Sequence, residues 1–295
     1  MNVSTTTADC RNSRAKLGRL ALVPTMGALH AGHISLIEIA RKHAQHVAVS
    51  IFVNPTQFGP REDFVRYPRP IEADLEKCRA AGVDMVFNPP VEEMYSPNPG
   101  GMQATESPAE QVHLDIPPLT GMLEGRIRPN HFKGVCQVVA KLFNIVQPNV
   151  AVFGLKDYQQ LRVLTAMTEA LNWPIEIVGG PTLRETDGLA MSSRNQYLTE
   201  PERQRAQSIP RGLFAARDEF DKGVRQTNRL IATVQKILLD AGTLGRVHVS
   251  IDYIAAVDAM TLKDVQVIAA PTLLAVAARV GNTRLIDNVM LSPGS

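Results

Sequence analysis

Short, nearly continuous apolar runs alternate with longer segments whose apolar residues recur at helical spacing. The apolar runs lie at residues 20–23, 47–53, 83–87, 150–154 and 175–178. The segments with helical spacing lie at residues 33–40, 72–81, 131–146 and 157–171. Runs of the first kind suit parallel strands that are buried on both faces of a sheet. The alternation therefore predicts an α/β fold with a doubly wound, parallel, Rossmann-like sheet, and a stretch rich in proline and glycine at residues 95–101 predicts a loop.

The pattern changes after Leu198. Thr199, followed three residues later by Glu202, has the spacing of a capping box that begins a helix. Helices are expected to about residue 220 and again over residues 227–241, and alternating segments at 249–254, 272–277 and 284–287 predict strands. We therefore expect two domains: a Rossmann-like domain over residues 1–183 and a smaller C-terminal α/β domain over residues 184–295.

The composition is that of a soluble globular protein. The 295 residues are 44% hydrophobic and 20% charged, and the net charge of +2 gives no broad basic field of the kind that binds nucleic acid. No apolar run approaches membrane-spanning length, and the N-terminus lacks a secretory signal and is expected to be a frayed polar end. The three cysteines are widely spaced, which favours neither a disulfide framework nor a zinc site and indicates a reducing cytoplasm.

Two histidines mark the first candidate site. His30 and His33 lie where the apolar run that stops at Pro24 gives way to a helix; Gly27 precedes both histidines and Gly32 lies between them. A helix N-terminus presents free N–H groups and a positive dipole end, which bind phosphate, and two imidazoles can neutralise a phosphate in its transition state. Zinc binding is the alternative, but neither a His-Glu-x-x-His motif nor a neighbouring cysteine or aspartate completes such a site. Ordinary capping or core histidines are a further alternative.

Other polar residues follow the next strands. Gln57 leaves the second strand and offers a donor and an acceptor together, although a surface glutamine is an equal alternative. Lys156 could provide a charge for phosphate, Asp157 could bind ribose or cap a helix, and Gln160 could face the same pocket as Gln57. The polar segment Met191–Arg194 follows Gly188 and could clamp a triphosphate, although a domain linker is the simpler reading of it alone.

Taken together, these segments resemble the pantoate–β-alanine ligase family. The match rests on ordered motifs across the first domain and one in the second: Pro24–His33, Ser50–Phe58, Tyr67–Arg69, Arg128–Val135, Lys156–Leu161, Asp187–Asn195 and Ala278–Asn288. The resemblance implies that ATP and pantoate form pantoyl adenylate and pyrophosphate, with Mg²⁺, and that the amine of β-alanine then displaces AMP. It also implies a cytoplasmic homodimer that binds neither nucleic acid nor membrane.

The resemblance also assigns roles to individual residues. The residues implied in catalysis are His30, His33, Lys156 and Arg194. Those implied in ATP binding are Met26, Gly27, His30, His33, Gly154, Lys156, Asp157, Leu183, Met191, Ser192, Ser193 and Arg194. Those implied in binding pantoate or β-alanine are Gln57, Gln160, Met26 and Arg128.

The chain departs from the family pattern at three positions. Ala31 and Leu155 each stand where the family often has a glutamate. Ala73 interrupts the pair of acidic residues that the family often has before Leu75, so Asp74 is left as the candidate metal ligand. The metal would then be held mainly by ATP phosphates and water. Two alternatives remain: a related nucleotidyltransferase that transfers AMP to a pantetheine-like substrate, and a catalytically silent nucleotide-binding protein.

Overall fold

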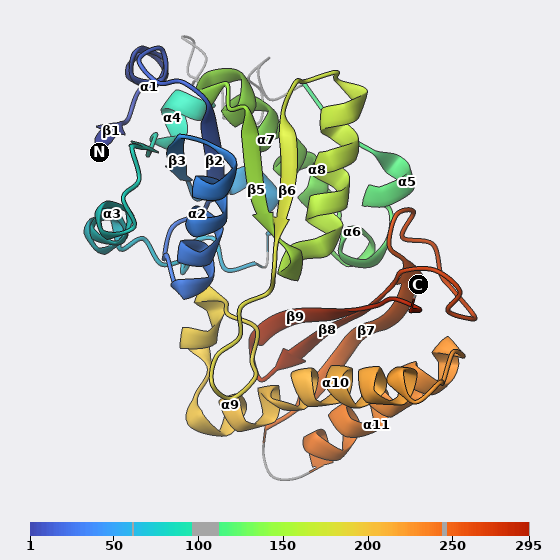
Figure 1. Cartoon of the computed structure of the whole chain (residues 1–295). Helices are drawn as coiled ribbons and strands as arrows, with labels where there is room; N and C mark the ends of the chain where they lie inside the picture. The colour runs from blue at the N-terminus through green and yellow to red at the C-terminus, as the bar shows by residue number, and fades with distance from the viewer. Residues whose placement is uncertain (61, 96–111, 244–246, 295) are drawn as a thin grey trace. The chain divides into compact units, whose positions relative to one another are not determined.

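The computed structural model describes residues 1–60, 62–95, 112–243 and 247–294. It divides into two compact units, of which the first comprises Met1–Leu155 and Gln160–Pro181 and the second Lys156–Gln159 and Thr182–Ser295 (Figure 1). The chain thus passes to the second unit after Pro181, where the sequence places the boundary after residue 183. Most of the loop expected at residues 95–101 lies outside the described residues.

The first unit contains a six-stranded parallel sheet, which confirms the predicted doubly wound α/β fold. The strand order is β1-β4-β3-β2-β5-β6. The strands are β1 (Asn2–Ser4), β2 (Leu20–Thr25), β3 (His46–Ile51), β4 (Met85–Phe87), β5 (Val150–Gly154) and β6 (Glu176–Gly180). Strand β2 continues beyond Pro24, where the sequence predicted its end. The pairing of β2 with β5 involves only Ala21 and Leu22, so the missing N–H of Pro24 interrupts no ladder there.

Helices cover both faces of this sheet. They are α1 (Thr7–Arg14), α2 (Ala31–His43), α3 (Ile71–Ala80), α4 (Val91–Met94), α5 (Pro117–Thr120), α6 (Leu123–Ile127), α7 (His131–Val146) and α8 (Tyr158–Ala170). Helices α2 and α3 bury apolar side chains against one face; this core includes Val23, Ile37, Val49, Leu75, Cys78 and Val152. Helix α7 packs on β2 from the other face and contacts α1 (Figure 1).

The prediction of a frayed N-terminus is wrong. Strand β1 pairs in parallel with β4, with Val3 opposite Val86, and so extends the edge of the sheet. The side chain of Thr6 caps α1 by accepting a hydrogen bond from the N–H of Asp9, and Cys10 is fully buried. The serine and threonine content indicated a disordered end, but pairing with a sheet edge outweighs local propensity in so short a strand.

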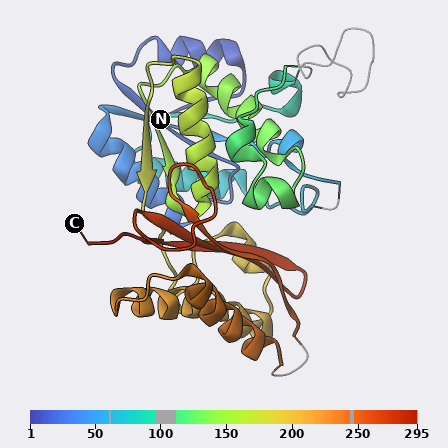
Figure 2. The ribbon, with the colours of Figure 1, turned by 90° about the vertical axis from the view of Figure 1, so that its right-hand side faces the viewer.

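The second unit is a smaller α/β domain, as expected. It contains an antiparallel meander of β7 (Val249–Asp258), β8 (Thr272–Val280) and β9 (Thr283–Leu291), and helices α9 (Glu200–Ala206), α10 (Ser208–Asp221) and α11 (Thr227–Thr243). The predicted capping box of Thr199 and Glu202 is present at the start of α9. Helices α10 and α11 pack on each other and on the sheet (Figure 2). Their core residues recur at helical spacing: Ile209, Leu213, Ala216 and Phe220 in α10, and Leu230, Val234 and Leu238 in α11.

The order of the parallel sheet locates its ligand-binding edge. Strand β2 lies between β3 and β5. The chain therefore forms β3 and β4 on one side of β2 and then crosses over to form β5 and β6 on the other side. In open α/β sheets ligands bind outside the carboxyl ends of the strands at such a reversal. The segment Met26–His30, which follows β2, begins at that edge.

Candidate active site

A tight turn joins the end of β2 to the start of α2. Gly27 and Ala28 both adopt left-handed backbone conformations, with φ of 82° and 50°. A Cβ atom on Gly27 would lie 3.0 Å from Oδ2 of Asp74 and 3.1 Å from Cγ2 of Ile51. Both the conformation and the lack of space therefore favour glycine at this position. The turn ends at His30, which is the N-cap residue of α2.

The two histidines form a compact pair at the N-terminus of α2. Nδ1 of His33 accepts a hydrogen bond from the main-chain N–H of His30 at 3.2 Å, and the N–H of His33 donates to the carbonyl of His30 at 2.8 Å. The ring centroids are 4.0 Å apart. Because Nδ1 of His33 accepts, the neutral ring carries its proton on Nε2. The pair thus has the donors and the helix position that phosphate binding requires.

The carboxylate of Asp74 lies beneath the same turn. Asp74 is 1% exposed, and its Oδ2 and Oδ1 accept hydrogen bonds from the N–H groups of Ala28 and Leu29, each at 2.7 Å. Mg²⁺ needs near-octahedral oxygen coordination and usually keeps several waters. Asp74 is almost wholly buried and each of its oxygens already accepts a backbone N–H group, so it offers a hydrated ion almost no exposed oxygen surface. Asp74 therefore does not fit the magnesium-ligand role that the sequence suggested.

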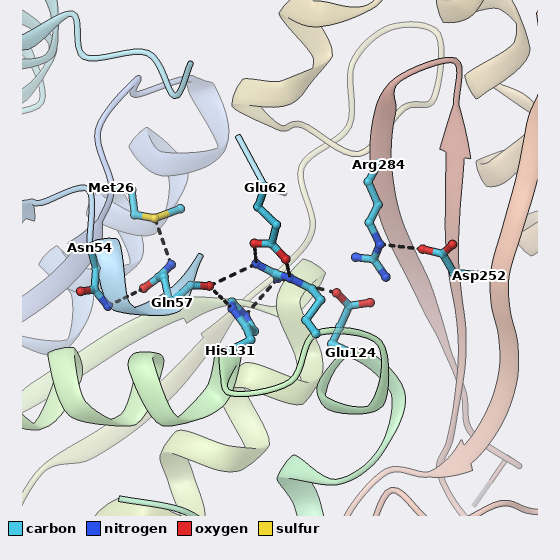
Figure 3. A network of polar contacts seen from close by, with 9 residues as sticks. Met26, Asn54, Gln57, Glu62, Glu124, His131, Asp252 and Arg284 are labelled. Carbon is cyan, nitrogen blue, oxygen red and sulfur yellow. Dashed lines mark hydrogen bonds and ion pairs between the residues drawn. The ribbon is translucent and has the colours of Figure 1, made fainter. Parts of the chain in front are cut away.

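The amide of Gln57 is held in a fixed orientation. Gln57 ends the 3₁₀ helix η1 (Pro55–Gln57), which follows β3, and it is 9% exposed. Its Oε1 accepts from Nδ2 of Asn54 at 3.1 Å, and its Nε2 contacts Sδ of Met26 at 3.0 Å (Figure 3). A thioether is a weak acceptor. The side-chain N–H of Gln57 can therefore leave Met26 and donate its hydrogen bond to a stronger acceptor, such as a carboxylate or hydroxyl of a ligand.

The imidazole of His131 joins Gln57 to Arg128. Nδ1 of His131 lies 2.8 Å from the main-chain oxygen of Gln57, and its second ring nitrogen lies 3.1 Å from Nη1 of Arg128 (Figure 3). A carbonyl oxygen only accepts, so Nδ1 carries the proton and Nε2 accepts from the guanidinium. Burial and the charge of Arg128 lower the pKa of His131 to about 4. His131 is thus a neutral structural link at neutral pH.

Arg128 is held by carboxylates on its other side. Its Nε and Nη2 each lie 2.7 Å from a carboxylate oxygen of Glu62, and Nη1 lies 3.8 Å from Oε2 of Glu124. Burial by itself would raise the pKa of Glu62, but the hydrogen bonds and charge of Arg128 lower it below the ordinary value. All three guanidinium nitrogens of Arg128 therefore have protein partners, which hold this side chain beside Gln57.

Further candidate residues follow β5. Gly154 is the last residue of β5 and pairs with Gly180 of β6. Lys156 lies in the 3₁₀ helix η4 (Leu155–Asp157), with Nζ 3.6 Å from Oδ1 of Asp157, and its carbonyl accepts from Nδ2 of Asn288 at 2.9 Å. Gln160 lies in the first turn of α8. Lys156 and Asp157 thus belong with the second unit, and Gly154 and Gln160 with the first.

The remaining candidates lie on a loop of the second unit. Leu183 is 40% exposed, and its carbonyl accepts from the N–H of Met191 at 2.9 Å. The side chain of Ser192 caps the 3₁₀ helix η5 (Ser193–Tyr197) by accepting from the N–H of Arg194 at 3.3 Å. Hydrogen bonds within the loop therefore shape the segment that carries the predicted phosphate ligands.

The structure joins some predicted residues and adds others that sequence reasoning missed. Within the first unit, side-chain and main-chain contacts connect Met26, Gln57 and Arg128. The predicted residues Lys156, Asp157, Leu183 and Met191–Arg194 belong to the second unit. The missed residues are Asn54, Glu62, Glu124 and His131, of which Asn54 and His131 lie inside motifs that carried the family resemblance. Across the part of the chain that the structure describes, no group of three or more His, Cys, Asp or Glu side chains could hold a metal ion.

Comparisons with known proteins give relatives that match nearly the whole chain. The family model described as pantoate-beta-alanine ligase matches residues 2–290. The pantothenate synthetase of Acidothermus cellulolyticus is 48% identical over 292 residues, which cover 97% of this chain and 90% of that protein. The pantothenate synthetase of Moorella thermoacetica is 50% identical over 272 residues, or 92% of this chain and 90% of that protein.

Solved structures give the same result. A pantothenate synthetase from Thermus thermophilus is 42% identical, with a TM-score of 0.88, and the match covers 99% of this chain and 100% of that one. A pantoate-beta-alanine ligase from Francisella tularensis, complexed with beta-gamma ATP and beta-alanine, is 30% identical with a TM-score of 0.76 and covers 100% and 99% of the two chains. These matches include both units, and the chain belongs to the pantoate–β-alanine ligase family.

Proposed function

We propose that this chain condenses pantoate with β-alanine to give pantothenate, with ATP converted to AMP and pyrophosphate through a pantoyl-adenylate intermediate. The observation that carries the proposal is the histidine pair on the turn after β2, at the edge where parallel α/β sheets bind ligands. The oriented amide of Gln57 supplies the neighbouring polar group that a hydroxy acid requires.

The first step is the attack of a pantoate carboxylate oxygen on the α-phosphorus of ATP. A phosphorus–oxygen bond forms to pantoate, the bond from the α-phosphorus to the bridging oxygen breaks, and pyrophosphate leaves with the electron pair. Nε2–H of His33, together with His30, donates to the α-phosphate oxygens, and Lys156 adds a positive charge. The carboxylate is already a nucleophile, so these residues contribute positioning and electrostatic stabilisation.

The second step is the attack of the β-alanine amine on the acyl carbon. The new carbon–nitrogen bond replaces the acyl bond to phosphate oxygen, AMP leaves, and the amine loses a proton to solvent. Gln57, Gln160 and Met26 form the pantoate site in this proposal. Arg128 supports that site through its contact with the Gln57 carbonyl, at 3.4 Å, and its own carboxylate partners.

The nucleotide-binding residues of this proposal come from several segments. Gly154 allows the ribose to approach the backbone, Asp157 accepts from its hydroxyls, and the exposed Leu183 contacts adenine. The phosphates are bound by the loop residues Met191, Ser192, Ser193 and Arg194. Mg²⁺ would arrive as its complex with the triphosphate, since Asp74 does not fit as its ligand, and no step here depends on a protein ligand to the metal.

The nucleotidyltransferase alternative is not favoured. The relatives named pantothenate synthetase match across at least nine-tenths of this chain, which includes the second unit. The silent-protein alternative also lacks support, because the candidate catalytic residues are all present: His30, His33, Lys156 and Arg194.

A cytoplasmic homodimer is part of the proposal. The three cysteines Cys10, Cys78 and Cys136 are buried free thiols, which suits a reducing compartment. None of the helices in the described ranges has the length and apolar character that crossing a membrane would take. Sedimentation of the purified chain measures the assembly directly, and a monomer at working concentration would contradict the dimer.

The decisive experiment measures pyrophosphate release from ATP and pantoate before β-alanine is added. We expect a burst close to one pyrophosphate per active site, followed by AMP and pantothenate when β-alanine arrives. Omission of pantoate is the control and should abolish the burst. Release that requires β-alanine from the start would exclude the adenylate route, and transfer of AMP onto a pantetheine-like substrate would favour the alternative.

A further inference from the structure

Two residues of α3 hold the turn that carries the candidate catalytic histidines. Asp74 accepts from the N–H groups of Ala28 and Leu29, each at 2.7 Å, and Nζ of Lys77 donates to the carbonyl of Leu29 at 2.6 Å. Three main-chain groups on two successive residues are therefore bound from one neighbouring helix. The next residue along the chain is His30.

The conformation at this position requires such support. Ala28 has φ of 50°, a left-handed conformation that is uncommon for a residue with a Cβ. A non-glycine residue persists there when surrounding contacts compensate for the strain. Charge-assisted hydrogen bonds to a carboxylate are among the strongest available, and Asp74 accepts two of them from this turn.

The same bonds decide which donors face a phosphate. In a typical phosphate-binding turn the main-chain N–H groups point at the anion. Here the N–H groups of Ala28 and Leu29 point at Asp74 instead, so neither can bind ATP while the carboxylate is in place. The candidate donors for a phosphate on this turn are therefore the side chains of His30 and His33 and the N-terminus of α2.

We propose that Asp74 is a positioning residue that fixes the Ala28–Leu29 backbone, and through it the orientation of His30 and His33, rather than a ligand of Mg²⁺. Lys77, on the same helix α3, supports the turn by donating a hydrogen bond to the carbonyl of Leu29. The inference rests on the proposed adenylation function for its catalytic consequence, but the contacts themselves do not depend on that function.

The test compares Asp74→Asn with Glu72→Gln, an exposed acid on the same helix. An asparagine can accept one N–H but presents its own NH₂ group to the other, so the turn loses an anchor. We expect the kcat of pyrophosphate release to fall about 100-fold, the cost of a small misplacement of reacting groups. The KM values for ATP and pantoate should change little, and Glu72→Gln should behave as the unchanged protein.

Titration with Mg²⁺ separates positioning from metal binding. Excess Mg²⁺ should not restore the kcat of Asp74→Asn, because the misplacement of the turn does not depend on metal concentration. Restoration by Mg²⁺ would overturn the proposal and assign Asp74 to the metal. An unchanged kcat would overturn it as well, since the turn would then hold its geometry without the carboxylate.

An amide NMR spectrum gives a readout that is independent of activity. The amide protons of Ala28 and Leu29 should lie downfield in the unchanged protein and move upfield in Asp74→Asn, while those of α7 stay in place. If Asp74→Asn does not fold, Lys77→Met removes the part-buried contact to the Leu29 carbonyl and should lower kcat with both KM values retained. Unchanged chemical shifts of Ala28 and Leu29 in a folded variant would refute the positioning role of Asp74, even if the chain proved to catalyse another reaction.

Discussion

Nδ1 of His33 accepts the main-chain N–H of His30 at 3.2 Å, and this bond determines which ring nitrogen of His33 can serve a ligand. An accepting nitrogen carries no proton, so the neutral ring presents Nε2–H away from the backbone. A donor fixed before ATP arrives needs no reorganisation when charge develops on the phosphate. We therefore expect His33 to act as an oriented hydrogen-bond donor in the proposed adenylation step.

Replacement of His33 by alanine should slow adenylate formation. If the ring contributes as one oxyanion donor does, pyrophosphate release from ATP and pantoate should fall by about 10²–10³-fold. The matched control is His43→Ala at the other end of α2, where the ring contacts Glu176 at 3.1 Å on the surface. Near-normal release by His33→Ala would contradict the role, as would an equal loss in the control.

Replacement of Gln57 by alanine should weaken pantoate binding more than ATP binding. The amide of Gln57 is already oriented by Asn54, and its NH₂ group faces the weakly accepting sulfur of Met26. A site built to bind hydroxyl and carboxylate groups loses much affinity when one partner disappears, because the remaining polar groups stay unpaired. Steady-state kinetics should show a raised KM for pantoate with the KM for ATP nearly unchanged.

The control for Gln57→Ala is Gln204→Ala. Gln204 is exposed on α9, and its side-chain amide donates to Glu200 at 3.2 Å on the same helix. This variant should match the unchanged protein in both KM values. Equal increases for ATP and pantoate in Gln57→Ala would indicate a general distortion of the site and would count against a pantoate contact.

The parts of the fold that the sequence predicted share one property. Strands β2, β3 and β5 are buried on both faces, so their apolar runs are nearly continuous and stand out from the helical spacing around them. Strand β1 has only three residues and one buried position, and nothing local distinguishes it from a polar terminus. Strand β1 forms because it pairs with β4, and this tertiary contact has no signal in the local sequence.

The same distinction applies to the candidate site. His30, His33 and Gln57 could be predicted because each follows a strand within a recognisable motif. The link from Glu62 through Arg128 and His131 to Gln57 joins segments far apart in the chain, and no local pattern reports it. The sequence suggested Asp74 only as a candidate metal ligand, whereas the proposed positioning role depends on the direction of the Ala28 and Leu29 N–H groups.

The link at His131 predicts a pH dependence of stability. The folded state lowers the pKa of His131 from 6.5 to about 4. Between these values the unfolded chain binds a proton that the folded chain does not, so the free energy of unfolding should decrease as the pH falls through this window. His131→Asn keeps a donor near the Gln57 carbonyl but cannot titrate, so its slope should be smaller by up to roughly one proton.

Urea unfolding at a series of pH values between about 4 and 7 measures this slope, because the linkage applies between the two pKa values. His248→Asn, at an exposed histidine of the second unit, is the control for the substitution itself. A slope in His131→Asn that equals that of the unchanged protein would show that other groups account for the acid sensitivity.

A buried ion pair of the second unit joins β9 to the loop that carries the predicted phosphate ligands. Nη1 and Nη2 of Arg184 donate to the two carboxylate oxygens of Asp287 at 2.7 and 2.9 Å, and Asp287 is 4% exposed. The guanidinium also lies 4.7 Å from the ring centroid of Phe214. This pair connects the base of the Leu183–Arg194 loop to β9, so its loss should loosen the loop as well as destabilise the unit.

Arg184→Met should lower the free energy of unfolding by about 3–5 kcal/mol, because it leaves a buried carboxylate without its partner. The comparison is Arg19→Ala, which breaks a pair with Glu176 whose side chains are 53% and 46% exposed and should cost only about 0–1 kcal/mol. The double variant Arg184→Met with Asp287→Leu removes both charges and should recover much of the loss. Hydrogen exchange at residues 183–194 should be faster in Arg184→Met than in Arg19→Ala. If the two single variants had equal stability and exchange, the ion pair would not be what anchors the loop, and its shape would have to come from its own hydrogen bonds.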